Sequence, residues 1–424
     1  MNKKINLQIK KISVKVGNNK ILIQNFSYLS ALRIFSLLLP LVTYPYLIRV
    51  LGKETYGLVV FAQAIVGYLL IFVSFGFNIS ATKEVSVHRN NPDKLSEIVS
   101  SILILKGMLF IVAFIILYTL FYFIPQVKGK EPLFILTMWV CLYDVIFPIW
   151  YFQGIEQMKY ITYITLVSRL IFLILIFILI HSAADYLMFP IINGIGAVIA
   201  GIISLYIVFY QRHIKFKTPS MENLKYYFKG SLPIFISNVS GQLYVNTNKV
   251  IVGAFLGMTD VAYYDLGQKL TSVLQIPQRI LSQALFPKIS KEKNLGFIKK
   301  VFKFSTLLNV ALYFFIFLFA KPIVVLLGGH QMINAIPVVH ILTLTVPIIG
   351  MSYIFGILLL IPFGYEKDFS RVIVFAGLIY LVQALFIWAF IGFSIINVSI
   401  ITLTTEMFVT VFIFYFCKKH KLWS

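Results

Sequence analysis

The sequence predicts an all-α integral membrane protein with about twelve transmembrane helices in two six-helix lobes, related by a pseudo-two-fold axis along the membrane normal. Three observations lead to this fold class. Only 12% of the 424 residues are charged, whereas 59% are hydrophobic. Apolar runs of about 20 residues, the length that crosses a bilayer, recur along nearly the whole chain. The runs are continuous rather than alternating, which favours helices over the strands of a barrel.

Twelve candidate spans account for most of the chain, and the segments between them leave no room for a soluble domain that would hold an enzyme core. Each span is bounded by polar or charged residues, and several contain one or two prolines, which kink membrane helices. In chain order, the predicted spans are residues 28–50, 56–77, 98–123, 132–152, 160–182, 187–209, 231–256, 261–286, 301–327, 336–361, 369–391 and 395–417.

The longest polar interruption near the middle of the chain divides the spans into six and six. No cleavage site of a signal peptide follows the first apolar run, so the basic segment before it is expected to rest on the anionic inner leaflet. The predicted organisation is an N-terminal segment at 1–27, an N-lobe at 28–210, a linker at 211–230, a C-lobe at 231–417 and a short tail at 418–424.

The net charge of +22 reflects membrane topology rather than a nucleic-acid partner. Twenty-six of the 37 lysines and arginines fall in segments on one side of the predicted spans, and five fall on the other side. Such a bias follows the positive-inside rule, so we expect both termini and the 211–230 linker to be cytosolic.

The two halves of the chain echo each other at offsets of about 205 to 210 residues. An even number of spans in each half makes the repeats parallel, and transporters with repeats bind their substrate near the bilayer midplane between them. The matching features are Leu51-Gly52 followed by Tyr56 with Leu256-Gly257 followed by Tyr263, Lys83 with Lys288, and Gly154-Ile155-Glu156 with Gly364-Tyr365-Glu366.

Three segments carry a resemblance to a known family. They are the run from Pro40 to Gly52 with Tyr56-Gly57 following, Trp150-Tyr151-Phe152-Gln153-Gly154 with Met158, and the run from Asn248 to Gly253 leading to Tyr263-Tyr264. With two six-helix lobes, the chain resembles the multidrug/oligosaccharidyl-lipid/polysaccharide exporter superfamily. Within it, these segments look like the bacterial polysaccharide repeat-unit flippases of the O-antigen type.

The resemblance implies a flippase that translocates an undecaprenyl-pyrophosphate-linked oligosaccharide by alternating access, for O-antigen or capsule assembly. It also implies a location in the bacterial inner membrane and contact with membrane lipid. The polymerase and chain-length proteins of the same pathway are further partners that the resemblance suggests.

Polar residues follow one face of several spans, which indicates that those faces point at protein or water rather than lipid. Any single stripe could be explained by hydrogen bonds between helices. Because stripes occur in both halves of the chain, we expect them together to line a hydrated central cavity. The stripes of the C-lobe are Asn238, Gln242, Asn246 and Lys249; Asp265, Gln268, Ser272, Gln275, Arg279 and Ser282; and Ser399, Thr402, Glu406 and Thr410.

Apart from cations assigned to the segments at span ends, six are placed inside predicted spans, where they are costly. Lys106 is expected to extend toward the membrane surface, and Lys269 lies one turn after Asp265, which can neutralise it. Arg33, Lys249 and Arg279 have no obvious acidic partner. We expect these three, with the neighbouring Gln242, Asn246 and Gln275, to bind an anionic head group; extension of the cations toward the surface is the alternative.

Two carboxylates, Asp144 and Glu406, are also placed near the middle of spans. Asp144 is expected to form a structural ion pair with Arg169, because a helical hairpin puts them at the same depth. Glu406 has no such partner, so a role in proton coupling or gating stands beside simple hydrogen bonding within the bundle. Asp265 is the second candidate for coupling or gating.

No cofactor or metal is predicted, because the six histidines lack ligand spacing and no phosphate-binding loop with the pattern G-x-x-x-x-G-K occurs. Cys141 and Cys417 fall in apolar segments and imply no disulfide. Two alternatives to the flippase remain. A multidrug or cation antiporter of the same superfamily conflicts with unpaired cations in the cavity. A membrane polymerase or glycosyltransferase conflicts with the short outer loops.

Overall fold

The structure is a computed structural model. It describes the backbone of residues 2–423. Side chains are described in the same range except at 2–23, 25–27, 29–31, 33–34, 37–38, 41, 237, 240–241 and 243–246.

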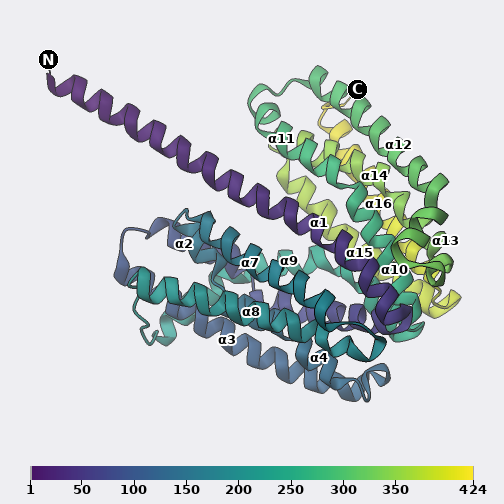
Figure 1. Cartoon of the computed structure of the whole chain (residues 1–424). Coiled ribbons are helices and arrows are strands. Elements are labelled where there is room, and N and C mark those ends of the chain that lie inside the picture. Colours follow the sequence, from purple (N-terminus) through teal and green to yellow (C-terminus); the bar gives the residue numbers. More distant parts are fainter. Residues whose placement is uncertain (1, 424) are drawn as a thin grey trace. The chain divides into compact units, whose positions relative to one another are not determined.

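Residues 2–423 are helical almost throughout and contain no strand (Figure 1). Short 3₁₀ or π segments join several helices end to end, so one predicted span often consists of two or three helices. In chain order the α-helices are α1 (Asn2–Ser74), α2 (Phe77–Val87), α3 (Pro92–Phe123), α4 (Glu131–Thr137), α5 (Trp139–Ile146), α6 (Ile149–Gly154), α7 (Met158–Leu179), α8 (Met188–Tyr206), α9 (Met221–Phe255), α10 (Met258–Leu274), α11 (Ile276–Glu292), α12 (Leu295–Gly328), α13 (Ile336–Thr343), α14 (Thr345–Ser352), α15 (Glu366–Phe386) and α16 (Ile395–Lys419).

Nine stretches of the described helices are long and apolar enough to cross a membrane. Their outer faces carry large apolar side chains, such as Leu318 and Phe390, which are 71% and 78% exposed. Surfaces of this kind are stable against lipid chains and costly in water. The most polar predicted spans, 231–256 and 261–286, are helical too, in α9, α10 and α11. The all-helical membrane fold expected from the sequence is confirmed.

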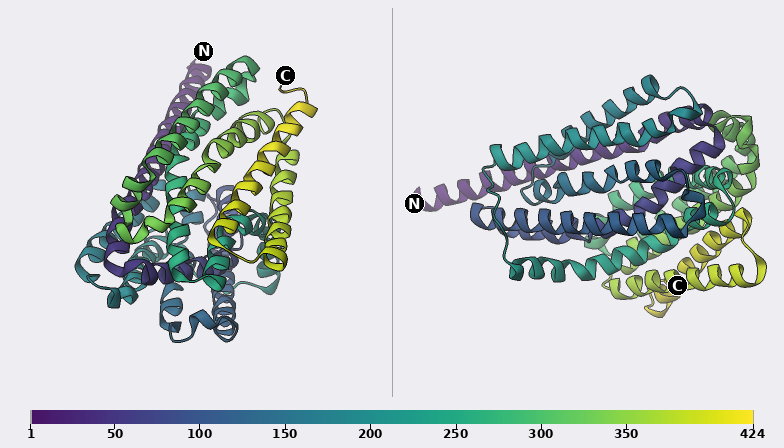
Figure 2. Two further views of the ribbon diagram at one scale, coloured as in Figure 1. Left: turned by 90° about the vertical axis from the view of Figure 1, so that its right-hand side faces the viewer. Right: turned by 90° about the horizontal axis from the view of Figure 1, so that it is seen from below.

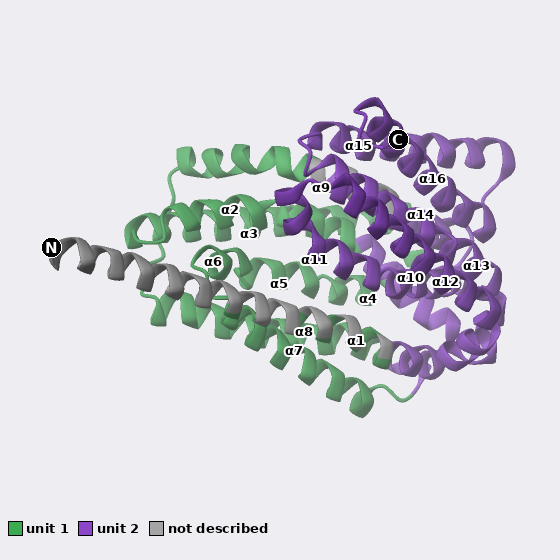
Figure 3. Cartoon of the chain, turned by 90° about the horizontal axis from the view of Figure 1, so that it is seen from above, with its two compact units in different colours: residues 1–43, 66–181, 187–236 green, residues 44–65, 182–186, 237–424 purple. Residues whose placement is uncertain are grey.

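By their contacts, the helices form two compact units (Figure 3). Unit 1 contains 1–43, 66–181 and 187–236, and unit 2 contains 44–65, 182–186 and 237–424. The predicted lobes and these units have different bounds. Residues 44–65 and 182–186, which the sequence places in the N-lobe, belong to unit 2, and residues 231–236, which it places in the C-lobe, belong to unit 1.

The 44–65 segment packs in unit 2 because a small residue lets two backbones meet. A Cβ atom at Gly57 would lie 1.7 Å from the carbonyl oxygen of Met258, so only glycine permits this approach of α1 to α10. The helical path of α1 is interrupted just before, at Gly52, whose φ is +76°. Gly257, its counterpart in the sequence repeat, has a φ of +123° at the start of α10. Both glycines allow the chain to begin a new helix at the same point of each half.

Unit 1 is held together by an aromatic core and by close helix packing. Phe75 stacks on Phe228 and Phe235, with ring centroids 4.4 and 4.5 Å apart. Helices α7 and α8 run side by side (Figure 2), because Gly196 of α8 leaves space for Ser168 of α7. Unit 2 uses the same device: Gly350 of α14 leaves room for the buried Asn309 of α12.

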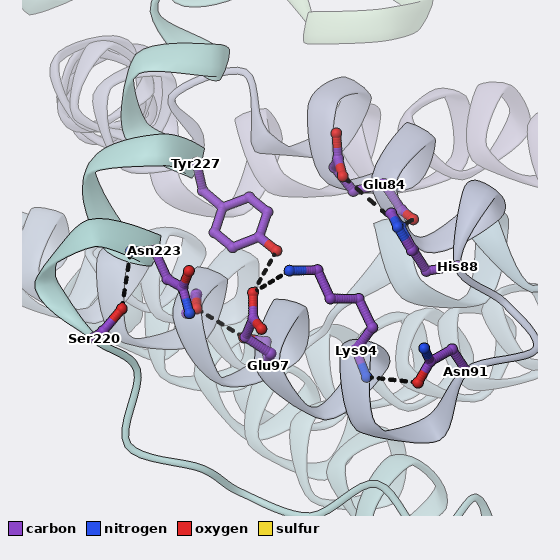
Figure 4. A network of polar contacts seen from close by, with 9 residues as sticks. Glu84, His88, Asn91, Lys94, Glu97, Ser220, Asn223 and Tyr227 are labelled. Atoms are coloured by element: carbon purple, nitrogen blue, oxygen red, sulfur yellow. Dashed lines mark hydrogen bonds and ion pairs between the residues drawn. The ribbon is translucent and has the colours of Figure 1, made fainter.

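A polar network closes one end of unit 1, where α2 turns into α3 and α9 begins (Figure 4). Glu97 accepts hydrogen bonds from Lys94 Nζ at 2.6 Å and from the Tyr227 hydroxyl at 3.2 Å. Burial, together with the Glu97 carboxylate beside it, raises the pKa of the Tyr227 phenol. Tyr227 therefore remains a hydrogen-bond donor at neutral pH and ties the start of α9 to α3.

A buried ion pair lies in the middle of unit 1, and it is not the predicted one. Lys106 Nζ donates to Asp144 Oδ2 at 2.8 Å and to the Asp144 carbonyl at 2.9 Å. Asn78 adds a donor to the same carboxylate at 3.4 Å. The prediction that Lys106 extends to the surface is wrong, because its side chain is 0% exposed. Asp144 thus pairs with Lys106 of α3 rather than with Arg169 of α7.

We predict that Asp144→Asn lowers the stability of the folded protein by about 3–5 kcal/mol, because it leaves the Lys106 ammonium buried without a counter-charge. Thermal unfolding of the purified protein in detergent measures the loss. The double variant Lys106→Met with Asp144→Leu should recover most of it. As a control, Asp93→Asn breaks the exposed pair with Lys217 and should leave unfolding unchanged. An Asp144→Asn protein as stable as the parent would contradict this assignment.

Candidate functional site

The candidate site is a cavity of about 340 Å³ within unit 2. Polar side chains from two of the predicted stripes meet here, together with apolar and aromatic residues of the helices opposite. The lining residues are Tyr264, Gln268, Thr271, Ser272, Gln275 and Arg279 on α10 and α11; Leu342, Thr345, Ile349, Ser352, Tyr353 and Ile357 on α13, α14 and the segment after it; Phe369 and Ile373 on α15; and Thr402, Glu406 and Val409 on α16.

The wall built by α10 and α11 follows the predicted stripe through a break in the helix. Helix α10 ends at Leu274 and α11 begins at Ile276, with Pro277 in its first turn. Proline lacks the amide hydrogen that would bond to the carbonyl group one turn earlier, so the hydrogen-bond pattern of the helix is interrupted there. Gln275 is the residue at the break, and Arg279 lies one turn beyond it.

Arg279 is the only cation among the cavity-lining residues. Its Nη2 donates to Gln275 Oε1 at 2.9 Å, which orients the guanidinium toward the break between the helices. Its Nε is buried and has no hydrogen-bond partner within the described residues. A buried donor without an acceptor is costly, so a ligand that accepts from this guanidinium would be stabilised.

Glu406 provides the only carboxyl group of the cavity lining. It lies on the inner face of α16, one turn after Thr402. No described residue forms a salt bridge with its carboxyl group. The cavity therefore holds one cation and one carboxyl group that do not neutralise each other as an ion pair.

A hydrogen-bond network fixes the wall between α10 and α16. Asn248 Nδ2 donates to the Tyr264 hydroxyl at 2.8 Å and to Thr402 Oγ1 at 2.7 Å. Tyr380 donates to Asn248 Oδ1 at 2.6 Å. Four helices are joined through the fully buried Asn248 side chain, which keeps Thr402 and Tyr264 at fixed places in the cavity lining.

A second network fixes α11 from behind. Gln278 Oε1 accepts from Asn309 Nδ2 at 2.9 Å and from the Ser305 hydroxyl of α12. Gln278 Nε2 donates to Ser282, the last member of the predicted stripe, at 3.3 Å. Ser282 is buried and contributes to helix packing, so hydrogen bonding between helices explains this end of the stripe.

Asp265, the first member of the same stripe, lies outside the cavity in a charge cluster of its own. Lys249 Nζ donates to Asp265 Oδ1 at 2.7 Å, and Lys269 donates to Oδ2. The Tyr56 hydroxyl donates to Oδ2 at 2.7 Å and accepts from Lys269 at 2.6 Å. The pairing of Asp265 with Lys269 agrees with their spacing of one turn. The prediction that Lys249 has no acidic partner is wrong.

Of the other predicted substrate-binding residues, Gln242 and Lys249 do not line this cavity. Gln242 is exposed on α9. The side chains of Arg33 and Asn246 lie outside the described residues, so their predicted role stays a prediction. Arg169, the expected partner of Asp144, lines a different cavity in unit 1. Of the predicted site, the structure brings together Gln275, Arg279 and Glu406.

Several lining residues were not singled out in the sequence. Thr345 and Ser352 bracket the short α14, and Tyr353 begins the π segment that follows it. They lie in an apolar span whose polar residues are small and irregularly spaced, so no stripe marks them. The prolines at 337 and 347 of this span signal only that the helix is irregular.

This arrangement suits a ligand that is both anionic and rich in hydroxyl groups. Arg279 offers charge-assisted hydrogen bonds, and Gln268, Ser272 and Gln275 offer neutral ones. Aromatic residues on the opposite wall provide apolar faces against which sugar rings can pack. No group of three or more His, Cys, Asp or Glu suited to a metal occurs among the described side chains.

Comparisons with known proteins agree on one family. Residues 22–293 match the family model described as "Polysaccharide biosynthesis protein". A protein of Escherichia coli (strain K12) named "Putative O-antigen transporter" is 30% identical over 414 residues, which cover 96% of this chain and 99% of the relative. A protein of the same name from Shigella dysenteriae is 26% identical over 82% of this chain and 88% of its own.

Solved structures with the same fold are membrane transporters. A structure titled "Lipid II flippase MurJ, inward closed conformation" aligns with a TM-score of 0.74 over 92% of this chain and 87% of its own, at 14% identity. An inward-facing transporter of the multidrug resistance MATE family aligns with a TM-score of 0.72 over 90% and 94%, also at 14% identity. At this identity the likeness extends to the fold alone.

We predict an asymmetry within the Asp265 cluster. Asp265→Asn removes the only carboxylate and leaves Lys249 and Lys269 side by side, so stability should fall by about 3–5 kcal/mol. Lys249→Met should cost much less, because Lys269 still balances the carboxylate. Melting temperatures of the two variants in the same detergent provide the comparison. Equal losses of melting temperature in the two variants would mean that Lys269 alone does not balance the Asp265 carboxylate.

Proposed function

We propose that this chain, which belongs to the polysaccharide biosynthesis protein family, is a flippase for a polysaccharide repeat unit linked to undecaprenyl pyrophosphate. The resemblance to polysaccharide repeat-unit flippases that the sequence suggested is confirmed by this membership. Both relatives are named as transporters, and the chain is accordingly a transporter rather than an enzyme. The lipid link and the sugar-phosphate chemistry of the substrate are parts of the proposal.

The observation that carries the proposal is the cavity with Arg279. It places polar side chains inside a bundle whose outer faces are apolar, and among the described residues its one cation, Arg279, has a buried Nε without an acceptor. A pyrophosphate supplies the oxygens that such a guanidinium binds in bidentate fashion. The neutral donors and acceptors next to it match the hydroxyl groups of a glycan.

The proposed orientation places both termini on the cytosolic side of the bacterial inner membrane. The support is the distribution of lysines and arginines, of which twenty-six lie on the side assigned to the cytosol and five on the other. We propose that the protein works by alternating access, in which the substrate head group enters from the cytosolic side and leaves on the outer side. The acyl carrier would stay in the lipid throughout.

A cation antiporter of the same superfamily is the second candidate, and one observation favours it. Glu406 has no salt-bridge partner and lies in the cavity, where a carboxylate would attract an organic cation. Arg279 in the same small space opposes this, because it repels cations. The two functions predict opposite effects of removing Arg279: loss of glycan export in one case and unimpaired or improved drug efflux in the other.

The test is complementation of a bacterial strain that lacks its own O-antigen transporter but keeps its glycosyltransferases and polymerase. The parent protein should restore surface glycan. Arg279→Ala should reduce the glycan to about a tenth or less, because one charge-assisted hydrogen-bond site is worth a factor of ten or more in binding. The Arg279→Lys variant should give an intermediate amount of glycan, because lysine keeps the positive charge but lacks the planar guanidinium that binds two oxygens at once.

Two controls accompany this prediction. Membrane levels of each variant, measured by immunoblot, separate transport from folding. Arg371→Ala removes an exposed arginine of unit 2, which pairs with Asp368 outside the cavity, and should leave glycan unchanged. Full glycan from Arg279→Ala at matched protein levels would remove the anion-binding role of Arg279.

We further predict that Glu406→Gln folds normally but changes the pH dependence of transport. Glutamine keeps the shape and the hydrogen-bonding capacity of the side chain and cannot release a proton. If Glu406 couples transport to protons, the variant should show transport that no longer varies with external pH. Initial rates in inverted membrane vesicles at several pH values provide the measurement. Parent-like rates at every pH would assign Glu406 to helix packing instead.

A further inference from the structure

The Arg169 guanidinium is a cation inside the membrane that has no acidic partner. All fifteen Asp and Glu residues of the chain have described side chains, and none of them forms a salt bridge with Arg169. Its expected partner, Asp144, is occupied by Lys106 at 2.8 Å.

Arg169 lies near the middle of α7, eleven residues from Met158 and ten from Leu179. At 1.5 Å per residue it is about 15 Å from either end of the helix. The arginine side chain spans less than half of that distance, so it cannot bring its charge to the membrane surface by extending along the helix. An unpaired guanidinium at this depth is costly and is typical of a functional site.

The side chain borders a cavity of about 290 Å³ within unit 1. Helix α1 contributes Ser36, Leu39 and Pro40, α7 contributes Ser168, Arg169 and Phe172, and α8 contributes Asn193 and Gly196. None of these residues belongs to the cavity of unit 2. A Cβ atom at Gly196 would come within 2.7 Å of Ser168 Oγ, so glycine keeps the space beside Arg169 open.

Three polar side chains of this cavity can donate hydrogen bonds to a ligand, and the fourth, Ser36, already donates to the Leu32 carbonyl at 2.6 Å. Arg169 offers its guanidinium, Ser168 its hydroxyl, and Asn193 the second hydrogen of an amide whose nitrogen already donates to the Phe189 carbonyl at 3.0 Å. No lining residue is acidic. Several donors around a guanidinium, without a competing carboxylate, match the oxygens of a phosphate group.

We propose that the Arg169 cavity is a phosphate-binding site of unit 1, separate from the Arg279 cavity of unit 2. The inference rests on the proposed function, because the ligand that it names is the diphosphate of the lipid-linked substrate. Phospholipid is a second source of the same chemistry. Its phosphate lies at the bilayer surface, about 15 Å from the midplane, whereas a translocated diphosphate must pass the depth of Arg169.

Binding of undecaprenyl diphosphate without sugars to the purified protein in phosphatidylcholine nanodiscs tests the site. Arg169→Ala should weaken binding about tenfold or more, and Arg169→Lys should weaken it less. Ser168→Ala removes one neutral donor and should weaken binding a few-fold. The matched control is Arg89→Ala, which removes an exposed arginine of unit 1 that pairs with Glu156 at 3.0 Å and should leave binding unchanged.

A second arm distinguishes the sources of phosphate. Native mass spectrometry counts the phosphatidylglycerol molecules that remain bound after purification from a mixed bilayer. Weaker undecaprenyl diphosphate binding by Arg169→Ala assigns the site to the carried lipid, and loss of phosphatidylglycerol alone assigns it to phospholipid; both support a phosphate site. Unchanged values in both arms, for a variant with the parent's melting temperature, overturn it.

Surface glycan in the complemented strain separates this inference from the proposed function. If the parent protein restores glycan and Arg169→Ala binds and transports like the parent, the Arg169 site is wrong and the flippase stands. If the parent protein does not restore glycan, the proposed function fails. In that case phosphatidylglycerol retention alone decides whether Arg169 binds phosphate.

Discussion

Charge balance inside the membrane is the constraint on which the rest of this structure depends. The predicted spans contain three carboxylates, and six cations lie in the span interiors: Arg33, Lys106, Arg169, Lys249, Lys269 and Arg279. Because an unpaired charge is costly in hydrocarbon, the position of each carboxylate decides which cations form stabilising ion pairs. Asp144 pairs with Lys106, and Asp265 pairs with Lys249 and Lys269. Arg169 and Arg279 form no salt bridge with a described residue, and each borders a cavity.

The paired charges also stabilise the framework around the candidate site. The Asp265 cluster joins α1, α9 and α10 through Tyr56 and Lys249, next to the glycine contact between α1 and α10. The buried Asn248 network continues this rigid wall to α15 and α16. Arg279 and Glu406 therefore project into a cavity whose shape is set by satisfied polar contacts, while their own groups remain available to a ligand.

One polar stripe of the sequence, on α10 and α11, reaches several environments of the fold. Asp265 of this stripe lies in a charge cluster, Gln275 lines a cavity, and Ser282 lies in a packing contact. Regular spacing along a helix predicts a shared face only while the helix is straight. The stripe from Asp265 to Ser282 also extends over seventeen residues, about 26 Å along the helix axis, so its members lie at different depths and meet different neighbours.

The sequence by itself determined the all-helical membrane fold, the two-fold repeat with its paired glycines at 52 and 257, and the pairing of Asp265 with Lys269. Each follows from hydropathy or from spacing along one helix, which are local properties. Only the tertiary structure decided that Asp144 takes Lys106 instead of Arg169, that Lys249 joins Asp265, and that Arg279 shares a cavity with Glu406. These contacts depend on how neighbouring helices rotate about their axes, and several helices offer a cation at the same depth, so depth in the membrane does not select the partner.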